Sequence, residues 1–397
     1  MTLRSFIFWP HLVAGVLAGS VIFLMSVTGT LLMYERQLIA WGDRAYRSAP
    51  PAPDAPRMPL EALAGLVTAA NPGSPITSIL MSAEADAPVT VVLGRQTVFV
   101  GAYSGAMLGE PSRGGVRRTM STLREWHRWL AISGENRSVA RLITGWSNAL
   151  FLFIVMSGFY LWFPRKWTQA AVRAVTLFNG RLSGKARDFN WHNVIGVWSC
   201  VPLFFVVITA MPISFPWANA LLFRAVGEAP PRPGPPPAAR EGAAARPREE
   251  RRPATVGFGG IDASWARAAQ QVPGWRTISL RVPSEPDAPF LFTIDRGDGG
   301  QPQLRDTLTV ARNGDVVRFE PFASQTLGRR LRSISRFTHT GEALGLVGQT
   351  VAGLVSAGGA AMVWTGLALT WRRFRAWRKR RSENPADQIE TPHTTAA

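Results

Sequence analysis

Four long stretches without a charged side chain stand out from the rest of the sequence. They follow Arg4, Arg141, Asp188 and Glu342, and each holds more than 20 residues. Because about 20 residues of helix cross the hydrocarbon core of a bilayer, the pattern predicts four transmembrane helices. We expect these helices at residues 6–34, 142–164, 191–222 and 345–371. The first apolar run is too long for a cleavable signal peptide, and no A-x-A site follows it closely.

Two segments between the helices carry shorter patterns. In residues 35–135, PLEALAGLVTAANP has the apolar spacing of a helix, and ITSILMS, APVTVVLG and TVFVGAYSGAML have the pattern of short strands. In residues 255–338, IDASWARAAQQVP is the expected helix, and WRTISLRV, APFLFTIDR and DTLTVARNGDVVRF are the expected strands, with Asn313-Gly314 as a hairpin turn. Each segment is therefore predicted to be a small α+β domain.

The two halves of the chain align with each other. PHLVAGVLAGSVIFLMSVTGTLLMYE in the first helix matches WHNVIGVWSCVPLFFVVITAMPISFP in the third without gaps. This alignment sets His11 on His192 and Thr28-Gly29 on Thr209-Ala210. SGFYLWFPRKW at the end of the second helix likewise matches TGLALTWRRFR at the end of the fourth. The pattern predicts a tandem repeat in which each copy consists of a membrane helix, a small α+β domain and a second membrane helix, with both copies in the same orientation.

The positive charge of the chain is concentrated beside the predicted helices. The chain has 44 Lys and Arg against 26 Asp and Glu, a formal net charge of +18. A basic loop covers residues 165–188, and the tail at residues 372–397 begins with a run of arginines. Since Lys and Arg beside membrane helices favour the cytoplasmic side, both segments and both termini are expected there. Much of the charge thus reports topology, and nucleic-acid binding is disfavoured.

Two further features are interpreted as structural. Residues 228–254 are rich in Pro and Arg and have too little apolar content to pack, so we expect a disordered linker. The only cysteine, Cys200, lies in the third helix, has no partner for a disulfide, and is interpreted as a small buried residue.

Four of the five histidines each precede a predicted membrane helix. His11 and His192 lie at the inner ends of the first and third helices, and His127 and His339 lie on the outer side before the second and fourth. His393 lies in the polar tail and is set aside. One histidine at a membrane interface is unremarkable, but four in matched positions favour a function. Neutral imidazoles that face each other at one depth are what six-coordinate haem iron requires, so we expect one iron site near each membrane face.

Neighbouring residues refine this prediction. Gly15 and Gly196 follow His11 and His192 by one helical turn, where a missing Cβ would let a flat macrocycle approach the backbone, although glycine also lines helix contacts in membranes. No C-x-x-C-H motif occurs, so any haem is b-type. Zinc would favour Cys or carboxylate partners, which the inner pair lacks. The alternative axial ligands are Met25, Met33, Met156 and Met211.

Three long segments carry a family resemblance. WHRWLAISGENRSVARLITGWSNALFLFIVMSGFYLWFPRKW, FNWHNVIGVWSCVPLFFVVITAMPISFPW and FTHTGEALGLVGQTVAGLVSAGGAAMVWTGLALTWRR resemble the PepSY-associated transmembrane helix family of bacterial inner-membrane proteins. The endings FVGAYSGAML and TVARNGDVVRF resemble PepSY domains. The resemblance implies an α-helical membrane protein: a four-helix transmembrane bundle built as a tandem repeat, with two periplasmic α+β PepSY-like domains.

The resemblance also implies an activity, because some members of this family are ferrisiderophore reductases. It implies a di-haem protein of the inner membrane that passes electrons from the cytoplasmic side to a ferric siderophore in the periplasm and releases Fe(II). The positions that match the family's helix starts are His11, His127, His192 and His339. The chain has no G-x-G-x-x-G after a strand, so a separate cytoplasmic flavoreductase or membrane quinol is the expected electron donor.

Two other classes of function remain as alternatives. PepSY units also occur as peptidase-associated inhibitory modules, so a haem-free protein could restrain a protease or assist siderophore uptake. A transporter is disfavoured, because the helices carry no mid-membrane charge that would bind or relay an ion.

Overall fold

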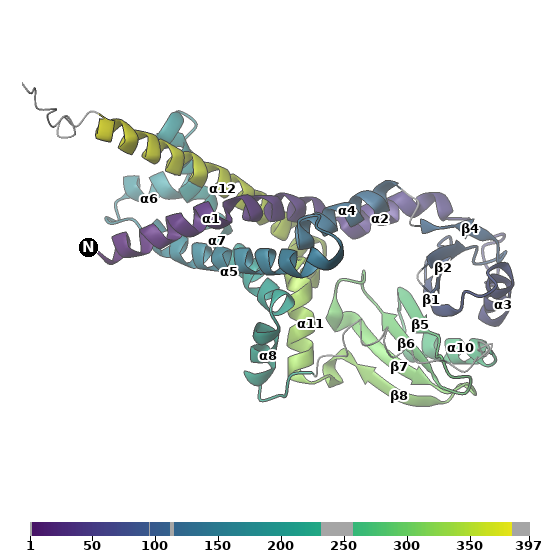
Figure 1. Cartoon of the computed structure of the whole chain (residues 1–397). Coiled ribbons are helices and arrows are strands. Elements are labelled where there is room, and N and C mark those ends of the chain that lie inside the picture. The colour runs from purple at the N-terminus through teal and green to yellow at the C-terminus, as the bar shows by residue number, and fades with distance from the viewer. Residues whose placement is uncertain (1, 95, 112–114, 232–256, 383–397) are drawn as a thin grey trace, which may run out of the picture.

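Four long helices form the body of the protein (Figure 1). The structure is a computed structural model and describes residues 2–94, 96–111, 115–231 and 257–382. The helices are α1 (Leu3–Leu32), α5 (Arg137–Trp162), α7 (Gly184–Ser214) and α12 (Gly345–Ser382). Each is long and apolar enough to cross a membrane, which confirms the four predicted apolar helices. α1 and α7 each pack against both α5 and α12, so α1 and α7 occupy diagonal positions in the bundle.

The boundaries of these helices differ from the sequence pattern at several ends. The predicted third helix, residues 191–222, is divided: α7 starts earlier, at Gly184, and ends at Ser214, and α8 (Pro216–Arg224) follows as a separate helix. Phe215 between them is extended, as expected for a residue that precedes proline. The basic loop at residues 165–188 contains α6 (Gln169–Thr176), and α12 continues well beyond the predicted end at residue 371.

One eight-stranded antiparallel sheet lies beyond one end of the bundle, which we call the sheet end (Figure 1). The strands in the first half are β1 (Ile76–Ser82), β2 (Val89–Leu93), β3 (Gln96–Val100) and β4 (Met107–Gly109). Those in the second half are β5 (Thr277–Arg281), β6 (Phe290–Asp295), β7 (Arg305–Val310) and β8 (Val316–Pro321). Their order is β4-β3-β2-β1-β5-β6-β7-β8, so the pairing of β1 with β5 joins the two predicted α+β units into one sheet.

A single hydrophobic core lies between the sheet and the helices α3 (Leu60–Ala70) and α10 (Ile261–Gln271). Alternate residues of β2 and β7 are buried in this core, as the period of a half-buried strand predicts. Phe290 and Phe292 are its largest fully buried side chains. The hairpin at Asn313-Gly314 is confirmed: Gly314 has φ of 91° and donates its N–H to the carbonyl of Ala311.

Two amphipathic helices connect the sheet with the bundle and were not expected from the sequence. They are α4 (Gly115–Trp129) and α11 (Leu327–His339). α4 ends where Leu130 and Ala131 take positive φ, and a short 3-10 turn then leads into α5. α11 reaches α12 through another short turn. The chain therefore reverses between His127 and α5, which brings His127 back onto the bundle.

The order of elements is the same in both halves. A helix, four strands, an amphipathic helix and a membrane helix follow one another from α3 to α5 and again from α10 to α12. The predicted linker at residues 228–254 lies mostly outside the described residues, as do His393 and the end of the basic tail.

Candidate cofactor site

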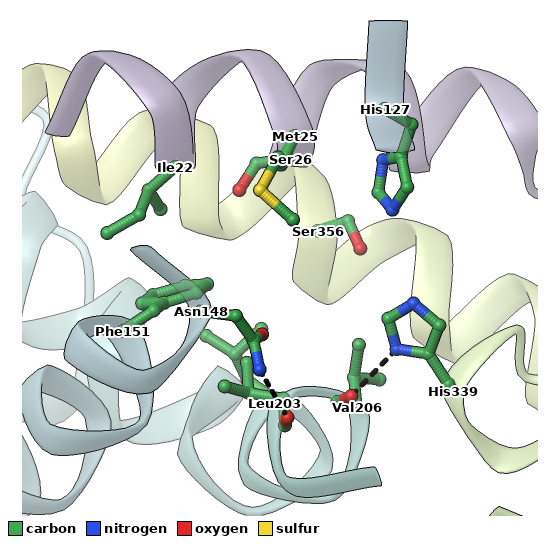
Figure 2. A pocket seen from close by; sticks show the side chains of 11 residues that line it. Ile22, Met25, Ser26, His127, Asn148, Phe151, Leu203, Val206, His339 and Ser356 are labelled. Carbon is green, nitrogen blue, oxygen red and sulfur yellow. Dashed lines mark hydrogen bonds between the residues drawn. The ribbon is translucent and has the colours of Figure 1, made fainter. Parts of the chain in front are cut away.

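Two histidines meet at the sheet end of the bundle, and we call them the sheet-side pair. His127 lies near the end of α4 and His339 is the last residue of α11. Their ring centroids are 6.2 Å apart and the rings are inclined by 45°. Figure 2 shows one nitrogen of each ring pointing toward the other ring. The pocket beside them is lined mainly by apolar side chains of α1, α5 and α7.

A hydroxyl group fixes the tautomer of His127. Its Nδ1 is 3.0 Å from Oγ1 of Thr28 on α1. Thr28 Oγ1 already donates its proton to the carbonyl of Leu24, at 2.7 Å. The hydroxyl oxygen is therefore left as the acceptor, and Nδ1 of His127 must carry the proton. Its Nε2 then has a free lone pair.

The same arrangement holds the two histidines at the other end of the bundle, which we call the far-end pair. His11 Nδ1 is 2.8 Å from Oγ of Ser157, and His192 Nδ1 is 3.0 Å from Oγ1 of Thr365. Each of these hydroxyls donates to the carbonyl four residues earlier in its own helix. Both imidazoles are thus set to donate through Nδ1 and to keep a lone pair on Nε2.

A glycine follows each of the three hydroxyl residues and makes room for the ring. A Cβ on Gly158 would lie 3.2 Å from Cε1 of His11, one on Gly366 3.3 Å from that of His192, and one on Gly29 3.4 Å from that of His127. Carbon atoms prefer separations of about 3.5–4.0 Å, so a methyl group would press on the rings of His11 and His192 and would just contact that of His127. We call each Ser/Thr-Gly pair a histidine seat. The three seats are Thr28-Gly29, Ser157-Gly158 and Thr365-Gly366.

The fourth histidine is held differently. The aligned position in α7 carries Thr209-Ala210, so it has the methyl group that the three seats lack. His339 instead donates from Nδ1 to the backbone carbonyl of Val206, at 2.9 Å. Because a carbonyl can only accept, this bond fixes the same tautomer as in the other three. All four imidazoles therefore keep Nε2 available as a ligand atom.

The far-end pair comes from the two diagonal helices. His11 on α1 and His192 on α7 are close enough to interact electrostatically. Of the two predicted glycines, Gly15 has no atom within 4 Å of the place of a Cβ, whereas Gly196 has Sδ of Met362 at 3.5 Å. Neither touches an imidazole, so the structure leaves their role in macrocycle binding as a prediction.

The other candidate ligands lie in different surroundings. Of the methionines considered as alternatives, Met25 lines the pocket of the sheet-side pair, Met156 is exposed, and Met211 accepts a hydrogen bond from Asn148. Among the described residues, no group of three or more His, Cys, Asp or Glu side chains could hold a metal ion. The chain therefore offers paired imidazoles in those residues rather than a closed cluster of zinc ligands.

Burial keeps the sheet-side pair uncharged. Loss of hydration, followed by the effect of the neighbouring His339, lowers the pKa of His127 from its ordinary value to about 4. Burial also lowers the pKa of His339. Both rings are neutral at pH 7, as ligand imidazoles must be.

The fold and the site together define a membrane protein with four apolar helices, an extramembrane sheet and two pairs of imidazoles presented from different helices. The chain belongs to the family described as PepSY-associated TM region, whose model matches residues 8–373. This match confirms the resemblance and extends over nearly the whole chain. No curated protein matches the sequence.

The histidine seats were missed at the level of sequence. The signal was present, since Ser-Gly and Thr-Gly recur near helix ends and Thr28 aligns with Thr209. What the sequence did not reveal is that each hydroxyl pairs with a histidine on another helix.

Proposed function

We propose that this protein carries electrons across a membrane through two b-type haems. His11 and His192 would hold one haem iron, and His127 and His339 the other. The observation that carries the proposal is the sheet-side pair, whose ring centroids are 6.2 Å apart with both Nε2 atoms free. A separation of this size would let His127 and His339 hold one haem iron between them.

The surroundings of the imidazoles support the same proposal. Each Nδ1–H donates to a fixed acceptor, which orients the ring and raises the basicity of Nε2. The residues between the pairs are mainly apolar, and burial in such surroundings is one of the factors that set the reduction potential of a haem. Haem, when bound, supplies reversible one-electron transfer. The protein itself has only to hold the imidazoles, exclude water and keep the two sites apart.

The direction of electron flow follows from the proposed topology. The basic loop after α5 and the arginines at the end of α12 favour the cytoplasm, which supports a topology with both termini inside and the sheet in the periplasm of a bacterial inner membrane. Electrons would enter near His11 and His192 from a cytoplasmic flavoreductase or from quinol. They would leave near His127 and His339.

The proposed acceptor is ferric iron held by a siderophore in the periplasm. Reduction labilises the metal, because Fe(II) binds hard oxygen ligands more weakly than Fe(III) does. Such a reaction is an outer-sphere electron transfer, so it needs no general acid or base from the chain. Iron would leave the complex as Fe(II).

A haem count on the purified full-length protein tests this proposal. We expect about two haems per chain and a reduced spectrum of b-type haem after addition of dithionite. His11→Ala and His192→Ala should each remove the same haem, and His127→Ala and His339→Ala the other. A colourless, folded preparation from haem-replete cells would refute the proposal and favour a haem-free regulatory protein.

A further inference from the structure

Arginine is concentrated on the two helices that carry the sheet-side pair. α4 has four arginines and one glutamate, and α11 has four arginines and no acidic residue. This composition opposes the proposed topology, because Lys and Arg beside membrane helices favour the cytoplasmic side rather than the outer one. Some role other than topology must therefore account for them. The eight residues are Arg117, Arg118, Arg124, Arg128, Arg329, Arg330, Arg332 and Arg336.

Three of these side chains form a group that we call the sheet-side arginine cluster: Arg128, Arg332 and Arg336. Arg336 acts as a like charge on both Arg128 and Arg332, so the group bridges α4 and α11. Arg332 and Arg336 are four residues apart and share one helix face. Arg128 directly follows His127, and Arg336 lies one turn before His339. The cluster therefore stands beside the sheet-side pair.

The carboxylates around this cluster are bound to other arginines. In the described part of the chain, none of the three cluster arginines has a carboxylate partner, whereas three neighbouring carboxylates have one. These ion pairs are Arg36 with Glu342, Arg124 with Glu35, and Arg137 with Glu125. Arg141, on α5, adds a further like charge near Arg128. The cluster thus carries positive charge that the described residues leave unbalanced.

Aromatic rings hold two of the guanidinium groups in place. The guanidinium carbon of Arg128 lies 4.6 Å from the ring centroid of Trp129, and that of Arg336 lies 5.5 Å from the centroid of Phe337. Stacking on a ring orients the guanidinium plane and leaves its N–H edges free. Arg128 and Arg336 are exposed and Arg332 is half-buried, so a ligand from solution can reach all three.

We propose that the sheet-side arginine cluster binds carboxylates. A guanidinium group matches a carboxylate with two parallel N–H donors, and an anion would relieve the repulsion among three neighbouring cations. Two sources fit this chemistry: the propionates of a haem held by His127 and His339, and an anionic ferric chelate with hydroxycarboxylate groups. The identity of these two ligands rests on the proposed function, whereas the arginine cluster is a feature of the chain that does not depend on that function. The second source makes negatively charged ferric chelates the preferred substrate class over uncharged ones.

The test uses full-length protein in nanodiscs of neutral lipid. The variants are Arg332→Gln/Arg336→Gln and, separately, Arg128→Gln, and the control is Arg318→Gln, which removes an exposed arginine from β8. If the ligand is a soluble chelate, calorimetry should detect binding of citrate to the parent protein. Citrate should bind the variants about 10- to 100-fold more weakly, since a charge-assisted hydrogen bond contributes about 1.5–3 kcal/mol. The KM of the variants for ferric citrate should rise by a similar factor, whereas their KM for an uncharged ferric trihydroxamate should be unchanged.

A second part of the experiment tests whether the carboxylates bound by the cluster are haem propionates. Apoprotein is loaded with haem or with its dimethyl ester, and the rate of haem loss is measured. If the cluster holds propionates, the variants lose haem faster than the control, and the ester abolishes this difference.

Two results would overturn the inference. One is parent protein that neither binds citrate nor differs from the variants in haem retention. The other is binding of phosphatidylglycerol vesicles that depends on the cluster while citrate does not compete. A haem-free protein that binds citrate through the cluster would refute the proposed function and leave the carboxylate site standing, so the two failures are distinguishable.

Discussion

Gly158→Ala should displace His11 without removing any ligand atom. The added Cβ would lie 3.2 Å from Cε1 of His11, so a contact at about 3.5–4.0 Å requires the ring to move by several tenths of an ångström. That movement strains the 2.8 Å hydrogen bond between Nδ1 and Ser157. In the α-helix itself the substitution is favourable by up to about 1 kcal/mol, so the helix should not unfold.

Under the proposed function, the expected result is weaker haem binding at the far end only. Loss of a residue that orients a metal ligand lowers affinity by about 10- to 100-fold, so we expect faster haem loss by this factor from the far-end pair. The sheet-side haem should be unaffected. The assay is transfer of haem to excess apomyoglobin, followed by absorption, with circular dichroism to verify the fold.

Matched variants separate the two parts of the seat. Ser157→Ala removes the acceptor but keeps Gly158, and should give a similar loss. Ser157→Thr reproduces the Thr-Gly pair of the other two seats and should retain the haem. Gly65→Ala, in α3 with no atom within 4 Å of the place of a Cβ, is the control. Release of haem from both Gly158→Ala and Ser157→Ala at the rate of the control would show that the Ser157-Gly158 seat does not hold His11.

Three further outcomes are expected. Ala210→Gly should let His339 move from the Val206 carbonyl to Thr209, which would alter the electron paramagnetic resonance spectrum of the proposed sheet-side haem. An identical spectrum would contradict the role assigned to the methyl group. Hydrogen bonds from the start of α11 lower the pKa of Glu228, so its stabilisation is present above pH 4.5 and lost as the pH falls through its folded value; Glu228→Gln should remove this part of the pH dependence of thermal unfolding. Phe292→Ala should destabilise the sheet by about 3–5 kcal/mol in chemical unfolding, and a loss under 1 kcal/mol would argue against the single core.

Local patterns predicted the parts of this fold whose signal is local. The apolar runs located the membrane helices, and alternation located the strands, because in both cases burial follows directly from the period of the element. The connecting helices α4 and α11 were missed because their polar, arginine-rich sequences bury few large side chains, Met120 and Phe337 among them. The predicted third helix extends too far because the residues after Pro216 remain apolar, although the chain bends there.

Contacts between distant segments were beyond the reach of those patterns. β1 and β5 each satisfy the signature of a strand, but nothing in either sequence specifies that Ser82 pairs with Thr277, almost 200 residues away. The histidine pairs were predicted from symmetry, whereas the seats depend on which helix faces which. A Thr-Gly pair becomes a seat only if an imidazole from another helix lies on it.

Each half of the chain contributes one imidazole to each histidine pair, which explains why the sheet that joins the halves matters for the candidate site. Each imidazole is oriented from within its own half: His11 and His127 bond to residues of α5 and α1, and His192 and His339 bond to residues of α12 and α7. Each pair, however, takes one imidazole from each half. The orientation of every ring is thus set locally, and the gap between paired rings is set by how the halves pack.

Two sets of contacts fix that packing. Inside the bundle, α1 packs on α12 and α5 packs on α7. Beyond it, the β1–β5 ladder joins the halves through one continuous sheet, on the side where α4 and α11 deliver His127 and His339. Because those two histidines lie on connecting helices rather than on membrane helices, their 6.2 Å separation depends on the sheet as well as on the bundle. A substitution that breaks the β1–β5 ladder should therefore disturb the sheet-side pair before the far-end pair.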